Sequence, residues 1–128
     1  MSHTIKNLRD VEDSAPKFGF DAVQEARFCR EDLDASKTGL AYMKVKPNQR
    51  QAFAHRHDEA EEIYVILSGS GRIKLDDEIL DVHALDAIRI APGVTRALEG
   101  GPEGIEYLAF GPHHDGDGEL VKDPGFWG

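Results

Sequence analysis

The chain has 128 residues, of which 40% are hydrophobic and 30% charged, and this length and composition are typical of one folded domain with a single core. Its formal net charge is −9 at pH 7, and because so acidic a protein repels phosphate backbones and anionic lipid, we expect neither nucleic acid nor a membrane as a partner. Cys29 is the single cysteine, and residues 1–10 contain no apolar run like that of a signal peptide. These features predict a cytoplasmic protein with a buried, structural thiol.

Residues 1–36 form the first predicted unit, an N-terminal arm. Within it, residues 22–31 fit a short helix or a strand, and periodicity does not separate the two. The aromatic residues of this segment indicate ordered structure and not a linker. We therefore expect the arm to pack on the rest of the protein or to cover an edge strand.

From Thr38 onward the sequence predicts about eight short strands, bounded by glycine- and proline-containing turns. Residues 68–71 (Ser-Gly-Ser-Gly) and 100–102 (Gly-Gly-Pro) are expected to be two of these turns. No helical period persists, so the pattern favours an all-β sandwich or barrel. Residues 113–128 form a C-terminal tail, whose Phe126 and Trp127 are expected to pack on the barrel. The predicted strands are residues 40–46, 51–57, 62–67, 72–75, 79–82, 87–90, 94–98 and 105–110.

A cluster of potential metal ligands lies at two neighbouring predicted strands. His55 and His57 share a strand face because side chains alternate with a period of two, and Phe53 lies on the same face. Glu62 begins the next strand and shares its face with Tyr64. Two imidazoles and a carboxylate suit borderline divalent metals and leave open positions for a substrate. The pattern therefore predicts a site for a metal or for a small polar ligand.

The spacing His55-x-His57-x4-Glu62-x6-Gly69 resembles the first motif of the cupin superfamily, and residues 91–93 correspond to the Pro-x-Gly turn of its second motif. The resemblance covers about residues 38–110. It implies a single jelly-roll-like barrel with two facing antiparallel sheets over residues 37–112, between the arm and the tail. It also implies a divalent metal (Fe, Mn, Zn or Ni), a small-molecule ligand, and a homodimer to which residues 1–36 contribute.

The chain departs from the family pattern at five positions. Gln49 and Leu85 stand where the two motifs usually open with glycine, Ala91 replaces a proline, and Gly100 replaces a later asparagine. The fifth departure bears on chemistry, since Arg96 stands where the family has its fourth ligand, a histidine. A guanidinium has no lone pair for a metal.

Three alternatives follow for Arg96. It forms a forked ion pair with Glu62 in a metal-free site, or it anchors an anionic ligand beside a metal held by the triad, or it extends outward to solvent. Phe53 and Tyr64 are expected to line the pocket with Arg96 as substrate contacts, although core packing fits both aromatics as well. Glu61, His83, His113 and His114 are expected at the surface, the last two in an acidic loop with Asp115 and Asp117.

Three functions remain open from the sequence. The first is a metal-dependent oxygenase, isomerase or lyase acting on a small anionic substrate. The second is a metal-free binding or sensing domain in which Arg96 pairs with Glu62, and the third is a structural oligomer with a vestigial site. The sequence names no catalytic residue and no substrate, because fold-level resemblance does not transfer chemistry.

Overall fold

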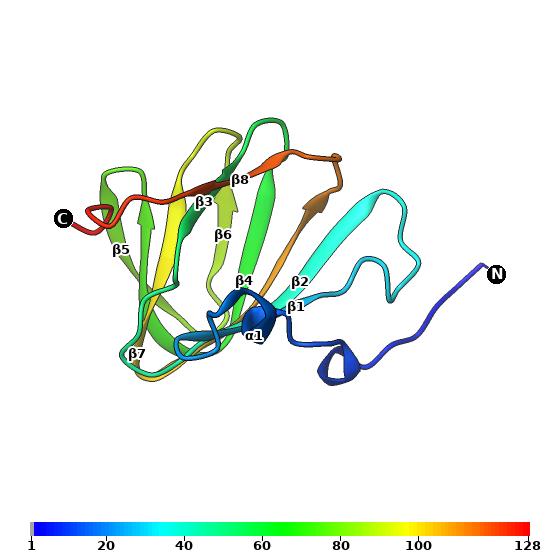
Figure 1. Cartoon of the computed structure of the whole chain (residues 1–128), viewed down its shortest axis with the longest axis horizontal. Helices are drawn as coiled ribbons and strands as arrows, with labels where there is room; N and C mark the ends of the chain where they lie inside the picture. Colours follow the sequence, from blue (N-terminus) through cyan, green and yellow to red (C-terminus); the bar gives the residue numbers. More distant parts are fainter. Residues whose placement is uncertain (1) are drawn as a thin grey trace.

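A computed structural model describes residues 2–128, and its regular secondary structure is almost entirely antiparallel strands (Figure 1). The two helical segments are one turn each, η1 (Leu8–Asp10) and α1 (Ala15–Phe18). The strands are β1 (Gln24–Phe28), β2 (Thr38–Val45), β3 (Ala54–His57), β4 (Glu62–Leu75), β5 (Glu78–His83), β6 (Ala87–Ile90), β7 (Arg96–Pro112) and β8 (Gly118–Val121).

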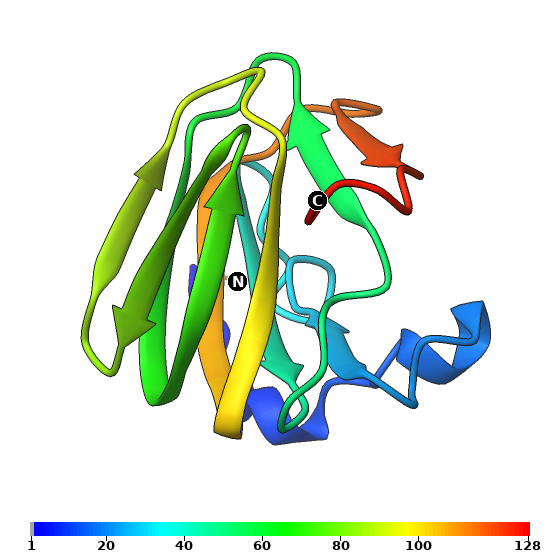
Figure 2. The same cartoon turned by 90° about the vertical axis from the view of Figure 1, so that its left-hand side faces the viewer.

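The strands form one sheet that curls on itself, with β4 and β7 as its long central pair (Figure 2). β2 and β1 continue from one side of β7, while β5 and β6 pair with β4. β3 pairs with β7 at the opposite end of that strand from β2, and β8 pairs with β3. The predicted all-β barrel fold is therefore confirmed. No helix in residues 2–128 is long and apolar enough to cross a membrane.

The predicted turns at residues 68–71 and 100–102 are wrong, because these residues lie inside the long strands β4 and β7. The pairing of the two strands shifts register here, between Gly69 and Gly71. A side chain at Gly71 would place its Cβ 2.0 Å from the carbonyl oxygen of Glu99. The glycines therefore allow β4 and β7 to approach each other closely where the sheet bends. They do not reverse the direction of the chain.

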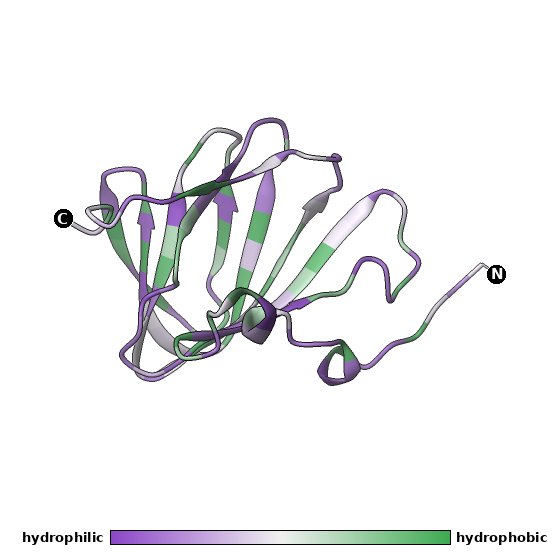
Figure 3. Ribbon diagram, in the orientation of Figure 1, coloured by the Kyte–Doolittle hydropathy of each residue, from purple (hydrophilic) through white to green (hydrophobic). Residues whose placement is uncertain are grey.

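The core lies between the inner faces of the curled sheet. Apolar and polar residues alternate along the strands, as a sheet with one buried face requires (Figure 3). The largest buried cluster comprises Val45, Tyr64, Ile66, Ile73, Val82, Ile90, Leu98, Ile105, Tyr107 and Ala109. A second cluster of Val11, Cys29 and Tyr42 packs the N-terminal segment against β2. Cys29 is fully buried, as expected.

The N-terminal segment contributes a strand to the sheet. β1 pairs with β2 over all five of its residues, which decides the helix-or-strand ambiguity in favour of a strand. A side-chain oxygen of Asp13 accepts hydrogen bonds from the backbone amides of Ala15 and Ala26 and so fastens α1 to β1. Dimerisation through this segment, and the division of the chain at residues 36 and 112, remain predictions.

The C-terminal segment runs alongside β3 (Figure 1). β8 pairs with β3 at all four of its residues. Farther on, the Arg50 guanidinium lies 4.8 Å from the centroid of the Trp127 ring, and the Lys74 ammonium lies 4.8 Å from that of Phe126. Both aromatic side chains thus contact residues of the barrel through cation–π interactions.

Candidate functional site

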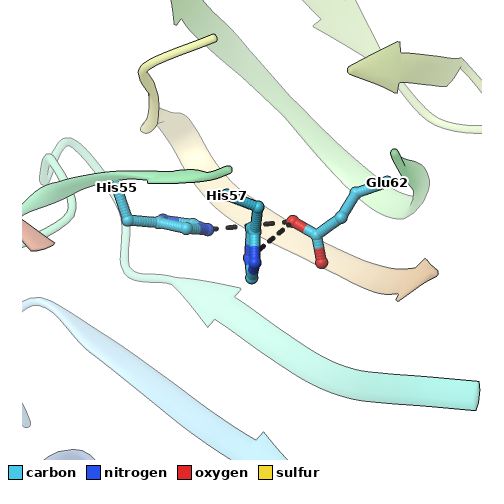
Figure 4. A group of neighbouring side chains, drawn as sticks. All are labelled: His55, His57 and Glu62. Carbon is cyan, nitrogen blue, oxygen red and sulfur yellow. Dashed lines mark ion pairs between the residues drawn. The ribbon is translucent and has the colours of Figure 1, made fainter. Parts of the chain in front are cut away.

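Three potential ligands converge inside the barrel. His55 and His57 project from the same face of β3, and Glu62 projects toward them from the first residue of β4 (Figure 4). Oε1 of Glu62 lies 3.3 Å from Nε2 of His57 and 3.9 Å from Nε2 of His55. One donor atom from each residue lies within 4.8 Å of the other two. Strand alternation and a short connection therefore suffice to assemble the cluster.

Arg96 shares this volume. It begins β7 directly opposite His55 in the β3–β7 pairing, and its side chain is 0% exposed. Its Nη2 donates to Oε1 of Glu62, its Nη1 donates to the Val94 carbonyl at 3.0 Å, and its Nε donates to the Tyr64 hydroxyl at 3.4 Å. The alternative in which Arg96 extends to solvent is thereby excluded, and all three guanidinium nitrogens have acceptors.

The contacts and charges within the cluster keep the Glu62 carboxylate ionised, and together with burial they give His55 and His57 different pKa values. Burial alone would raise the pKa of Glu62, but its contacts with His55 and His57 and the charge of Arg96 outweigh burial and hold that pKa far below its usual range. Burial lowers the pKa of His55. The contact with Glu62 raises the pKa of His57. His55 therefore presents a neutral imidazole more readily than His57 does.

The two aromatic residues predicted as ligand contacts occupy different places. Tyr64 is buried, and its hydroxyl lies 3.2 Å from Nε2 of His55. Burial raises the Tyr64 pKa to about 12, so the phenol remains protonated at physiological pH. Phe53 is half-buried and packs edge-on against Phe20, with ring centroids 4.9 Å apart.

A cavity of about 730 Å³ opens onto the cluster. His55, His57, Glu62 and Tyr64 form part of its polar lining, and its remaining wall is mostly apolar. Of the residues that the structure describes, those lining the cavity do not include Arg96. The apolar wall includes Phe18, Phe20, Phe28, Leu40, Met43 and Phe53, so the aromatics of the N-terminal segment close one side of the cavity.

The residues expected at the surface mostly lie there. Glu61 faces outward and contacts Arg89 at 3.4 Å, and His83 is exposed. In the acidic loop, His113 contacts Asp115 at 2.7 Å, but it is half-buried, and both His113 and His114 line the cavity. Asp117 behaves differently from the expectation for this loop, because its side chain is only 4% exposed and lies 3.3 Å from Nδ1 of His57. Sequence reasoning missed it because no local pattern links residue 117 to residue 57.

The donor set fits a divalent metal in chemistry and in spacing. Ligands that bind one ion at about 2.0–2.2 Å lie about 3–3.5 Å from each other, which is close to the separation of His57 and Glu62. Nε2 of His55 lies farther from the same Glu62 oxygen, at 3.9 Å. Arg96 supplies a hydrogen bond to the Glu62 oxygen in place of a fourth ligand, so the set is three donors facing the cavity.

Comparison with known proteins gives a consistent family. A family model described as a cupin domain matches residues 41–103. An uncharacterized protein of Methanocaldococcus jannaschii is 31% identical over 81 residues, which make up 61% of this chain and 65% of that protein. The chain thus matches somewhat less than two thirds of the length of this relative.

Three solved structures illustrate the likeness in fold. A cupin protein from Bacteroides fragilis shares 21% identity at a TM-score of 0.70, covering 98% of this chain and 96% of that chain. The polyketide cyclase RemF from Streptomyces resistomycificus shares 22% at 0.75, covering 96% and 88%. Oxalate decarboxylase from Bacillus subtilis shares 22% at 0.73, covering 94% of this chain but 33% of that one. The match to the cupin-domain model over residues 41–103 and the likeness to these structures together show that the chain has a cupin fold.

Proposed function

We propose that this chain holds a divalent metal ion through His55, His57 and Glu62 and acts on a small molecule bound in the adjoining cavity. The observation that carries the proposal is the convergence of the three donor atoms, all within 4.8 Å of one another, at a cavity of about 730 Å³. A cavity of this size accommodates a small organic ligand. The reaction would be of the oxygenase, isomerase or lyase type.

The role of each residue is inferred from its contacts. A bound ion would polarise a ligand oxygen as a Lewis acid. Arg96 is fully buried and already hydrogen-bonded, so we assign it to Glu62, whose carboxylate it orients and, together with His55 and His57, keeps ionised. The earlier expectation that Arg96 anchors an anion directly has no support from the cavity lining. Phe53 and the other apolar wall residues would hold the body of the ligand.

Proteins of similar fold support the proposal that this chain acts on a small molecule in its cavity. The structural neighbours include an oxalate decarboxylase, a polyketide cyclase and a sugar phosphate isomerase from Silicibacter pomeroyi. Their substrates differ in size and charge, so they support a class of function and not a particular ligand. The mostly apolar wall of this chain favours a ligand with an apolar or aromatic body and a polar group directed at Glu62.

A metal-free binding domain is the second candidate, and the contact between Arg96 and Glu62 favours it. In that case the guanidinium supplies the positive charge that a metal would otherwise provide. His55 and His57 would then contact the ligand by hydrogen bonds. The two candidates differ in whether a cation binds at all.

Metal titration of protein produced without an affinity tag distinguishes the candidates. After dialysis against a chelator, we expect Mn²⁺ or Zn²⁺ to bind at one ion per chain, and His57→Ala or Glu62→Ala to weaken binding at least tenfold. His83→Ala is the matched control, because His83 is exposed and remote from the cluster. Absence of binding to the unmodified protein, or equal weakening by the control, would reject the metal site and leave the metal-free candidate.

A further inference from the structure

Asp117 is a buried carboxylate outside the proposed ligand set. It precedes β8, and its side chain is only 4% exposed. Oδ1 accepts hydrogen bonds from the backbone amides of Asp58 (3.0 Å) and Glu59 (2.8 Å), and Oδ2 accepts one from the amide of Ala60 (3.0 Å). One carboxylate therefore satisfies three consecutive amides in the loop that joins the histidine strand β3 to Glu62.

The same carboxylate also lies next to His57, one of the three proposed metal ligands, on the Nδ1 side of its ring. Oδ2 of Asp117 lies 3.3 Å from Nδ1 of His57. That nitrogen is buried and has no hydrogen-bond partner among residues 2–128. Gly118 pairs with His57 between β8 and β3, and a Cβ at this position would be in ordinary van der Waals contact with the ring, 3.4 Å from its Cε1. A carboxylate oxygen of Asp117 thus lies beside a buried ring nitrogen that makes no hydrogen bond.

We propose that Asp117 is a positioning residue that holds His57 with a proton on Nδ1 and with its Nε2 directed toward Glu62. A histidine binds a metal through one nitrogen only when that nitrogen has no proton, and an acceptor at the other nitrogen fixes both the tautomer and the ring orientation. Asp117 would also fix the loop over residues 58–60, and with it the separation of His57 from Glu62. The effect on metal affinity rests on the proposed metal site, whereas the effect on the His57 proton does not.

A purely structural role is the competing explanation. Three amide hydrogen bonds would stabilise the loop whether or not His57 is involved, so loss of thermal stability on mutation would not separate the two roles. The discriminating quantity is the state of the His57 ring. If Asp117 positions it, the Nδ1 proton is hydrogen-bonded to a carboxylate and is protected from exchange with water.

The experiment compares Asp117→Asn with Asp115→Asn. Both remove one negative charge from the same segment, but Asp115 is 98% exposed and contacts only His113. In Asp117→Asn the amide keeps one oxygen, so it cannot accept from both the loop amides and Nδ1 as the carboxylate can. Imidazole ¹⁵N–¹H spectra are recorded with and without Zn²⁺, and Zn²⁺ affinity is measured by competition with a chelator.

We expect a protected His57 Nδ1 proton in the unmodified protein, its loss in Asp117→Asn, and a weakening of Zn²⁺ binding by about 10- to 100-fold. Asp115→Asn should change neither quantity by more than about twofold. An Asp117→Asn protein with an unchanged His57 spectrum and unchanged affinity would overturn the proposal, even if its melting temperature fell. Should that variant not fold, the absence of a protected Nδ1 proton in the unmodified protein would overturn it as well. Should the unmodified protein bind no Zn²⁺, the metal site would fail, and the spectrum of the metal-free protein would still decide the role of Asp117.

Discussion

Replacing Arg96 by histidine tests the charge balance of the site most directly. The guanidinium donates to Oε1 of Glu62, the oxygen that faces both histidines. A metal bound to that oxygen at about 2.1 Å would lie roughly 4 to 5 Å from the guanidinium charge. Repulsion between a divalent ion and one positive charge at that distance is about 2 kcal/mol in water and about 7 kcal/mol at an effective dielectric constant of 20. Arg96 therefore weakens metal binding under either assumption.

The lower figure sets the expected effect. About 2 kcal/mol corresponds to roughly a 30-fold change in affinity, because each 1.4 kcal/mol is a factor of ten. We therefore expect Arg96→His to bind Mn²⁺, Fe²⁺ or Zn²⁺ at least about 30-fold more tightly than the unmodified protein, with the added imidazole contributing further. Arg96→Gln separates the two effects, since it removes the charge without supplying an imidazole. It should fall between the unmodified protein and Arg96→His.

The assay is calorimetric titration at pH 7.5 after chelator dialysis, with thermal melting of the metal-free variants to check that each one folds. Melting matters because Arg96 is fully buried and its loss leaves Tyr64 and the Val94 carbonyl without a donor. The reasoning is refuted if the unmodified protein retains stoichiometric metal through dialysis and folded Arg96→His binds it no more tightly. In that event an anion or a movement of Arg96 must offset the repulsion.

Three further predictions concern stability and reactivity. Leu85 has a φ of 70°, which strains any residue except glycine, and its side chain is 81% exposed. Leu85→Gly should therefore raise the free energy of unfolding, measured in urea, by about 1 kcal/mol. A decrease would contradict the argument that Leu85 is strained. Burial raises the pKa of Glu99, but hydrogen bonds from Arg50 and Arg72 outweigh it and lower that pKa below 4.5. Glu99→Gln should therefore destabilise the protein at pH 7 by less than about 1 kcal/mol, since the ion pairs are half-exposed. This difference should shrink as the pH falls below 4.5, and a difference that persists at pH 2 would count against it. Burial also raises the pKa of Cys29, so a thiol reagent at pH 8 should react with it only at the rate of unfolding, and rapid labelling of the native protein would show that it is accessible.

The sequence predicted the geometry of the site better than the course of the strands. The period of two places His55 and His57 together, and this rule needs only local backbone geometry. The burial of Arg96 could be anticipated because Leu98 shares its strand face, and Leu98 is fully buried too. Glu62 was one of the alternatives for Arg96, but the sequence could not decide between them, because the outcome depends on where Glu62 and Tyr64 of another strand lie.

Glycine-rich segments misled the prediction of strand ends. A run such as residues 68–71 fits a tight turn and a bulged crossing equally well when only the local sequence is considered. What distinguishes them is the approach of residues 99–105 of β7 to the same place, which is a long-range contact. Asp117 was missed for the same reason. Its three loop amides and His57 lie in a distant part of the sequence, so no motif links them.

The pairing of β3 determines how the site can unfold locally. This strand carries both histidines, yet it pairs with β7 only at His55 and with β8 at all four of its positions. The long pair of β4 and β7 does not depend on β8 for its own hydrogen bonds. Detachment of residues 117–121 is therefore a local opening of lower free energy than global unfolding. Amide protons of β3 should then exchange with solvent at the rate set by that opening, so the organisation of the histidines and the thermal stability of the barrel can vary independently.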